Sequence, residues 1–471
     1  MKSTLDTSTD PQVGFRPPGS LLTASALQRY SGPWGIRQAA HLARRTGFGA
    51  TAQEVRDLTA LGMENAVNAV MHPPADDVDL PVYPDAAKLS DKKARYQAAQ
   101  MWWLDRMLRT KHPFLEKMAL FWHGHFATSM RKVPPELLVR QIALFRSRGL
   151  GDFRSLLLAV SQDPAMLVWL DNRFNYKSHP NENYAREVME LFALGLGNYA
   201  ENDVKNAARA FTGWSLDRNR DFRFRPNLHD DGEKTFLGRT GNFNGEDIIG
   251  IIVSQPISQR FITRKLLTFY LYSDPEPELT EKLASVYALS GYDIAKTMGT
   301  LLRSNVFYSM RAYRAVPKSP VEFAVGLLRY FGAEQIPPGT PYAIGRMGQE
   351  LLAPPSVKGW DGGPAWINTS TMLARFNAVN ALAQNRKPAA GMLNPVAIVR
   401  AAGEMDASRV LEYITSTAIQ DDLTSETRRT LMEYLQAKHA PNPTAFGPEN
   451  YEERIRGVLA LVLNSMPNQL N

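Results

Sequence analysis

The chain has 471 residues, of which 44% are hydrophobic, 21% charged and 10% aromatic, and this composition excludes disordered and collagen-like proteins. Lys and Arg outnumber Asp and Glu by 54 to 47, which gives a formal charge of +7 and a mild bias toward anionic partners. The sequence contains no Cys, so disulfides, thiol nucleophiles and Cys-ligated metal sites are excluded as well.

The first 33 residues are predicted to form a flexible tail, because Pro and small polar residues dominate them. They include Asp6 and Asp10 and lack an apolar run of signal-peptide length. No stretch of about 18 consecutive apolar residues occurs in the sequence. We therefore expect a soluble protein, cytoplasmic by default, without a transmembrane segment. A leader removed from a longer precursor would leave the same pattern.

Helix signals recur through the rest of the chain. Thr51 and Glu54 form a capping-box pattern before an apolar repeat that Gly62 interrupts. Asp163 and Pro164 have the residue types of a helix cap and a first helical position. Further helices are predicted at 181–194, 247–254, 257–272, 279–289, 294–303, 321–331, 368–383, 395–402, 408–417, 425–438 and 451–465. The predicted fold class is mainly α, a large multi-helix globular protein.

Residues 216–245 are the exception to this helical pattern. They lose the helical period, contain several glycines and alternate in the segment DFRFRP, which predicts an irregular loop region with one short hairpin. The expected organisation is a tail at 1–33, a helical domain at 34–390 with the loop 216–245 inserted, and a C-terminal helical extension at 391–471 packed on it.

Ordered motifs point to a known family. They are HLARRTGFG from residue 41, EKMALFWHGHFATS from 116, DPAMLVWLDN from 163, HDDGEKTFLGRTGNFNG from 229 and PPSVKGWDGGPAWIN from 354. Together they closely resemble the bacterial family catalogued as domain of unknown function 1800, over about His41 to Ala383. The resemblance implies a largely helical bacterial protein of unassigned chemistry, often encoded beside a sulfatase-like protein. It also leads us to expect a larger polar residue, usually Asn, at Gly124.

The helix predicted from Asn181 carries the first candidate site. Asn183, Glu187 and Glu190 lie at positions i, i+4 and i+7, so an amide and two carboxylates share one stripe. Such a stripe suits an acid/base pair or the binding of a cation. In this interpretation Glu187 is catalytic, Asn183 binds the substrate and Glu190 is a metal ligand. Alternatively, both carboxylates form structural ion pairs with Arg186 or Arg209.

His123 and His125 are a candidate metal-ligand pair. Positions i and i+2 point to nearly opposite sides of a helix, so a shared metal requires the helix to break at Gly124. The apolar positions, however, continue a helical face up to Phe126. A pair of hydrogen-bonded core histidines is therefore the alternative.

The segment HDDGEK lies in the irregular region, and long loops inside compact domains are often functional. His229 beside Asp230 suits a general base or a metal ligand, and Lys234 suits an anion clamp. These assignments make His229 and Asp230 catalytic. Alternatively, Asp230 and Asp231 satisfy backbone donors in a simple turn before Gly232.

Arginines and aromatic residues alternate just upstream of that segment. In a strand, Phe222 and Phe224 would face inward, while Arg223 and Arg225 would face outward as a fork for phosphate, sulfate or carboxylate. A solvated edge strand explains the same residues. Nucleic acid is not favoured, because no recognised binding module accompanies the arginines.

The segment GWDGGPAW supplies the last candidate. Trp360 and Trp366 flank Asp361 and two glycines, a composition suited to an aromatic platform for sugars or other ring-bearing ligands. The alternative is that both indoles pack beneath a loop.

Two hypotheses of function follow. The first is an enzyme of hydrolase or acid/base type, with a divalent metal as a candidate cofactor, acting on an anionic or carbohydrate-like substrate. The second is a non-enzymatic scaffold or maturation partner that binds a sulfatase-like protein.

Overall fold

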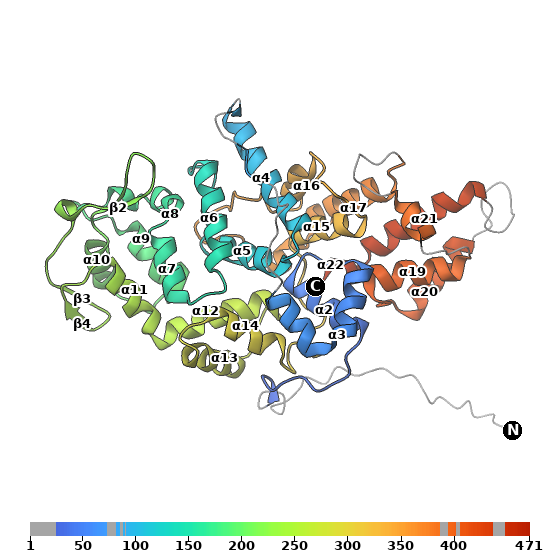
Figure 1. Ribbon diagram of the computed structural model, residues 1–471, viewed down its shortest axis with the longest axis horizontal. Coiled ribbons are helices and arrows are strands. Elements are labelled where there is room, and N and C mark those ends of the chain that lie inside the picture. Colours follow the sequence, from blue (N-terminus) through green and yellow to red (C-terminus); the bar gives the residue numbers. More distant parts are fainter. Residues whose placement is uncertain are drawn as a thin grey trace, which may run out of the picture.

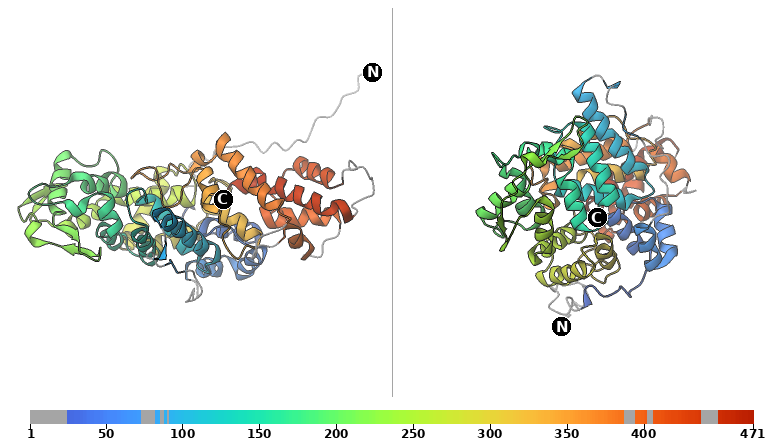
Figure 2. Two further views of the ribbon diagram at one scale, coloured as in Figure 1. Left: turned by 90° about the horizontal axis from the view of Figure 1, so that it is seen from above. Right: turned by 60° about the vertical axis from the view of Figure 1, so that its left-hand side comes forward.

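The structure, a computed structural model, describes residues 25–72, 82–84, 88–89, 91–386, 394–401, 406–436 and 448–471. Helices dominate these residues, which confirms the mainly α fold class. The molecule is elongated, with the segments around 200–250 at one end and the C-terminal helices at the other (Figures 1 and 2). The last residue returns to the middle of the molecule (Figure 1).

The first helices form the middle of the molecule and lead toward one end (Figure 1). Thr51 caps the second of them through the predicted capping box with Glu54, and Gly62 interrupts it with a φ of 73°. Asp163 caps another through the amides of Ala165 and Met166. The bounds are α2 Ile36–Thr46, α3 Ala52–Met71, α4 Lys92–Arg109, α5 Pro113–His125, α6 Pro135–Arg148, α7 Phe153–Ser161 and α8 Pro164–Trp169.

The irregular region forms the end of the molecule, together with the helices beside it (Figure 1). The sequence predicts one hairpin there, and the structure contains two. β1 pairs antiparallel with β2, and β3 pairs antiparallel with β4. The elements of this end are the 3-10 helix η2 Asn172–Phe174, α9 Glu182–Glu187, the π-helix η3 Val188–Ala193, α10 Glu201–Ala210, β1 Trp214–Leu216, β2 Phe222–Phe224, the 3-10 helix η4 Pro226–Leu228, β3 Lys234–Phe236, β4 Arg239–Gly241 and α11 Gly245–Ser254.

The chain then returns to the middle and continues to the opposite end. α15 joins the two parts, because Val325 belongs to the main hydrophobic cluster, whereas Phe323 and Leu327 belong to a second cluster with the C-terminal helices. The remaining helices are α12 Pro256–Tyr270, α13 Pro277–Leu289, α14 Ile294–Leu302, α15 Pro320–Tyr330, α16 Thr340–Arg346, the 3-10 helix η5 Gly363–Trp366, α17 Thr369–Ala383, α18 Pro395–Ala401, α19 Ala407–Ile419, α20 Ser425–Gln436, α21 Pro448–Asn464 and α22 Met466–Gln469.

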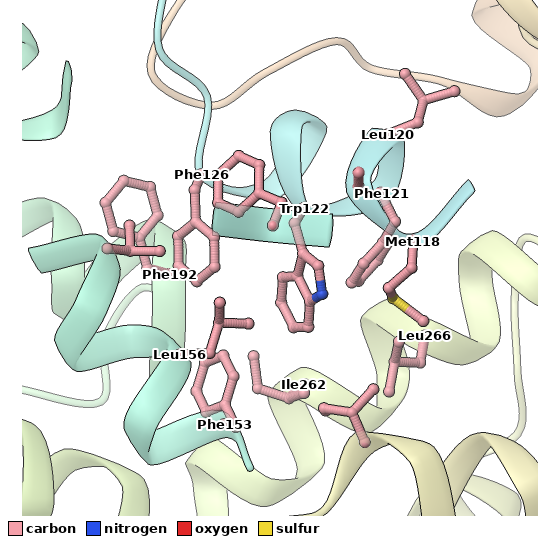
Figure 3. Packing of buried hydrophobic residues seen from close by; sticks show 14 of the residues in the cluster. Met118, Leu120, Phe121, Trp122, Phe126, Phe153, Leu156, Phe192, Ile262 and Leu266 are labelled. Atoms are coloured by element: carbon pink, nitrogen blue, oxygen red, sulfur yellow. The ribbon is translucent and has the colours of Figure 1, made fainter. Parts of the chain in front are cut away.

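Aromatic residues hold α5 in the main core (Figure 3). Trp122 stacks on Phe126 and on Phe153 of α7, with ring centroids 5.4 and 5.8 Å apart. Its indole Nε1 donates to the Gly149 carbonyl at 2.9 Å, so the polar atom of this fully buried ring is paired. Phe192 of η3 packs edge-on against Phe126. α5 is therefore a fixed support for the polar residues at its C-terminal end.

Part of the predicted tail lies within the described residues. The Tyr30 amide donates to the Arg303 carbonyl, and the Asn305 amide donates to the Gln28 carbonyl. Ala26 is buried. Residues 26–30 therefore contact the helical body and residues 31–33 are exposed, whereas residues 1–24 lie outside the described residues. No helix in the described ranges combines the length and the apolar run that crossing a bilayer requires.

Candidate functional site

A cavity of about 350 Å³ lies between α5, α12, the start of α15 and the segment 358–366. This volume falls within the range of roughly 300–1,000 Å³ that is typical of small-molecule sites. The cavity collects side chains from parts of the chain that are far apart in sequence. Its lining is Leu120, Phe121, Gly124, His125, Lys265, Thr268, Phe269, Ser273, Val316, Pro317, Ser319, Glu322, Gln349, Lys358, Trp360, Asp361, Gly362, Gly363, Pro364 and Trp366.

Aromatic rings supply much of the cavity wall. Phe121 of α5 and Phe269 of α12 meet edge-on with ring centroids 5.3 Å apart. Trp360 and Trp366 line the cavity from the segment 358–366. The sequence predicts a ligand platform at these two tryptophans and Asp361, and the structure brings all three to one cavity. Trp366 is also largely buried, so its indole packs beneath the loop as well, as the alternative interpretation predicts for it.

The segment 358–366 rests directly on the end of α5. Gly359 has a φ of 88°, and a Cβ atom there would lie 2.2 Å from the Gly124 carbonyl oxygen. Only glycine allows this contact. Gly124 itself lines the cavity, and a Cβ atom there would meet no atom within 4 Å. The position at which the family resemblance predicts a larger residue therefore opens into the cavity.

His125 offers a hydrogen-bond acceptor to the cavity. Its Nε2 lies 2.9 Å from the Phe192 carbonyl, which can only accept, so Nε2 carries the proton in the neutral ring. Burial and the nearby charge of Lys265 lower the pKa of His125 to about 3. The ring is therefore neutral at physiological pH, and its Nδ1 has no protein partner among the described residues.

His123 has different surroundings. It is fully buried, with its ring 5.3 Å from that of Trp103 and 5.5 Å from that of Trp360. Neither of its nitrogens has a hydrogen-bond partner, so it is not the hydrogen-bonded core histidine of the alternative. Burial lowers its pKa to about 3. α5 continues through both histidines, so the helix break that a shared metal requires is not formed.

Two lysines stand at the cavity. Lys358 pairs with Asp361 at 2.9 Å on the exposed side of the segment. Lys265 of α12 forms no hydrogen bond or ion pair with another described residue, and its closest aromatic partner is Phe261. Loss of water around its amine and the charge of Lys358 lower the pKa of Lys265. An anion between the two amines would relieve their repulsion.

The inner end of the cavity borders a group of buried cations. Arg45, Lys117, Lys318 and Arg375 are buried, and burial lowers the pKa of each. The charge of Glu322 opposes that shift in all four. The Glu322 carboxylate pairs with Lys117 and accepts from the Ser319 amide at 2.6 Å. This part of the described chain therefore carries an excess of positive charge beside the cavity.

The predicted helical stripe lies elsewhere. Arg186 pairs with Glu182 and Glu201 and forms no ion pair with Glu187 or Glu190. The Tyr199 hydroxyl donates to Glu190 at 2.5 Å, and Glu187 has no hydrogen bond or ion pair in the described residues. Burial and the charge of Glu190 raise the pKa of Glu187.

Asn183, the third member of the stripe, is exposed. None of the three residues lines the cavity.

The HDDGEK segment folds as a hydrogen-bonded turn. Arg209 binds Asp230 with two bonds of 2.7 and 3.1 Å, and Asp230 accepts from the Gly232 amide. His229 is buried, and its Nδ1 lies 2.9 Å from the Thr212 carbonyl.

The Lys234 amine donates to the carbonyls of Asp230 and Gly232. These hydrogen bonds match the alternative interpretation of the segment, in which it forms a simple turn before Gly232. The turn lies at the end of the molecule, away from α5 (Figure 1).

The β1–β2 hairpin, which carries the predicted arginines, is a third place at which predicted site residues lie. Arg223 pairs in register with Ser215 and is exposed, as predicted. Phe222 contacts Trp214 and is half-buried, but Phe224 is exposed although its ring contacts His229, so the prediction that both phenylalanines face inward is wrong for Phe224. Arg223 and Arg225 both line an open hollow at the hairpin. The predicted residues therefore fall into separate groups. His125, Trp360, Asp361 and Trp366 share the cavity.

Sequence reasoning missed several cavity residues. Lys265 lies in an ordinary amphipathic helix, and Glu322 has the spacing of a capping-box residue with Ser319. Gln349 carries no motif, and its Oε1 accepts from the Val321 amide. Only Gly124 gave a signal, as a departure from the family pattern. Among the described residues, no three His, Asp or Glu side chains are grouped as metal ligands.

The fold and the cavity define a large helical protein with an aromatic-walled cavity that borders a group of buried cations. A family model described as a protein of unknown function (DUF1800) matches residues 41–469, and the chain belongs to this family. The match extends beyond Ala383 and includes the C-terminal helices that the sequence analysis treats as an extension. No curated protein and no solved structure matches the chain.

Proposed function

We propose that the protein binds an anionic, carbohydrate-like ligand in the cavity between α5, α12 and the segment 358–366. The observation that carries the proposal is the combination of aromatic walls with a lysine, Lys265, that forms no hydrogen bond or ion pair with another described residue and contacts the Phe261 ring. Sugar rings present C–H groups that pack on aromatic faces, and their hydroxyls require a few fixed polar partners. His125 Nδ1 and the Gln349 side chain are such partners.

The charge of the site favours an anion. Lys265 and Lys358 line the cavity, and buried cations lie behind Glu322 at its inner end. Asp361 is engaged by Lys358, and Glu322 is engaged by Lys117. A carboxylate, sulfate or phosphate group on the ligand would accept charge-assisted hydrogen bonds from Lys265.

The cavity supports binding more directly than it supports hydrolysis. A general base works best with a pKa near the operating pH, and the pKa of His125 is about 3. His125 therefore acts as a hydrogen-bond acceptor that orients a ligand. The hydrolytic reaction and the sulfatase-like partner stay predictions.

A charge series of one sugar ring tests the proposal. Isothermal titration calorimetry would compare D-glucuronate, D-glucose and D-glucosamine, and we expect affinity to fall in that order. Lys265→Gln should weaken glucuronate binding by about tenfold or more, because it removes one hydrogen bond between charged groups. It should leave glucose binding unchanged.

Lys205, an exposed residue of α10 far from the cavity lining, supplies the matched control, and Lys205→Gln should behave like the parent protein. Equal affinity for the three sugars, or no binding of any of them, would contradict the proposal. Loss of glucuronate binding in Lys205→Gln would show that general charge, and not the cavity, causes the preference.

A further inference from the structure

A second pocket, of about 460 Å³, lies beside the β1–β2 hairpin, and it shares no residue with the aromatic cavity. One part of its wall is apolar and comes from α6, α8 and the hairpin. The other part is strongly basic. The lining residues are Lys132, Pro134, Leu137, Val168, Arg173, Phe174, Tyr176, Ser215, Leu216, Asp217, Arg220 and Arg225.

Three arginines in this lining lack a carboxylate partner in the described residues: Arg173, Arg220 and Arg225. The Arg173 guanidinium lies over the Phe174 ring, 4.6 Å from its centroid, and its buried Nε has no hydrogen-bond partner. Arg225 donates one bond, to the Leu216 carbonyl at 3.2 Å. Most of the donors of these three side chains are therefore free to bind a ligand.

The nearby carboxylates form no ion pair with these three arginines. Asp217 accepts from the backbone amides of Asn219 and Asp221 at 2.8 and 2.9 Å. Asp171 pairs with Lys132 at 2.6 Å, and Asp221 pairs with Arg140 at 2.5 Å. Asp171 offsets the charge of Lys132, and Asp217 offsets part of the remainder, so the three arginines leave the pocket with an excess of positive charge.

The backbone also holds one of the arginines in an unusual conformation. Arg220 has a φ of 62°, in the left-handed region that non-glycine residues rarely occupy. Asp217 and Asp221 fix this turn, because the Arg220 amide donates to the Asp217 carbonyl and the Asp217 amide donates to the Asp221 carbonyl. Strained residues of this kind are concentrated at ligand sites.

We propose that this pocket binds the oxyanion of an organic phosphate or sulfate ester. Arginine presents several donors in one plane and matches the oxygens of such groups with paired hydrogen bonds. Three guanidiniums surround one oxyanion, while Leu137, Val168 and Leu216 contact the organic part of the ester. Arg223 does not line this pocket, so of the two arginines that the sequence assigns to an anion fork only Arg225 belongs to it.

The test is calorimetric titration of the full chain with phenyl phosphate, phenyl sulfate, inorganic phosphate and phenol. We expect saturable binding of at least one ester, weaker binding of inorganic phosphate and no binding of phenol. Tighter binding of phenyl phosphate would assign the pocket to phosphate esters, and tighter binding of phenyl sulfate would assign it to sulfate esters. Absence of saturable binding by both esters would overturn the proposal.

Two variants link binding to the pocket. Arg173→Gln and Arg220→Gln should each weaken ester binding about tenfold, because each removes a charged hydrogen-bonding group. Arg218→Gln is the matched control on the same hairpin, since Arg218 lines the neighbouring hollow and not this pocket. An equal loss of binding in Arg218→Gln would overturn the proposal by showing nonspecific attraction. Unchanged thermal unfolding of each variant would show that the fold is intact.

Discussion

Glu322→Gln is expected to lower the free energy of unfolding by about 3–5 kcal/mol, the range for leaving buried charges uncompensated. Burial alone would raise the pKa of Glu322, but its contacts with Lys117 and Ser319 lower it below the usual range. Its charge also acts on three other buried cations, Arg45, Lys318 and Arg375. Glutamine keeps the shape and removes the charge, so all four cations lose their counter-charge. Urea unfolding at pH 7 measures the change.

The effect should be unequal for the two partners of the ion pair. Lys117→Met removes one cation from a group that already has an excess of them, so it should cost clearly less than Glu322→Gln. The double variant should recover part of the loss. Equal or larger destabilisation by Lys117→Met would contradict the role of Glu322 as the counter-charge of the whole group.

The same pair predicts a pH dependence of stability. The pKa of Glu322 is lower in the folded protein than in the unfolded chain. The stability that its charge contributes is therefore fully present at pH values above its pKa in the unfolded chain. This stability is lost as the pH falls through the pKa that Glu322 has in the folded protein. Glu322→Gln should therefore flatten the acid limb of the stability profile.

Gly359→Ala is expected to cost about 2 kcal/mol or more and to abolish binding in the cavity. Two penalties add at this position. The φ of 88° is unfavourable for any residue with a Cβ atom, and that atom would lie 2.2 Å from the Gly124 carbonyl oxygen. The contact can be relieved only if the segment 358–366 moves away from α5, which displaces Trp360. Thermal unfolding and glucuronate titration measure the two effects.

Gly363→Ala separates the two penalties. Gly363 also has a positive φ, of 51°, but a Cβ atom there would meet nothing within 4 Å. This variant should lose less stability than Gly359→Ala, and the comparison is made on stability alone because Gly363 also lines the cavity. If Gly359→Ala and Gly363→Ala behave alike, the contact between the segment and α5 does not position the cavity.

Much of the fold could be predicted from the sequence, because helix ends are determined locally. The Thr51 capping box, the Gly62 interruption and the Asp163 cap are all present as predicted. These features depend on hydrogen bonds within a few residues. The two short hairpins at 214–241 were predicted only in part, since strands of three residues leave little alternation to detect.

The cavity could be predicted only in fragments. Trp360, Asp361, Trp366 and His125 belong to dense motifs, and each was selected for its own composition. Their convergence depends on how α5 and the segment 358–366 pack, and no local pattern reports that contact. Lys265 was missed because a lysine on an amphipathic helix normally faces solvent, and Lys265 itself is exposed. Its significance comes from the cavity beside it.

The turn around His229 shows the opposite case. Its residue types and its irregular setting suit catalysis, yet Arg209 and the backbone engage Asp230 and Lys234. The sequence places polar groups in a loop but does not show which donors they satisfy. Structural ion pairs and catalytic sites use the same residue types.

The most direct measurement of the central claim is glucuronate binding by the parent protein and by Gly124→Leu. A side chain at this position would extend into the cavity without meeting an atom within 4 Å at its Cβ. Replacing glycine inside α5 should preserve or raise stability, by up to about 1 kcal/mol, since glycine is a poor helix former. We therefore predict an equally or more stable protein that no longer binds glucuronate. Binding that is unchanged in a folded Gly124→Leu variant would show that the ligand does not occupy this cavity.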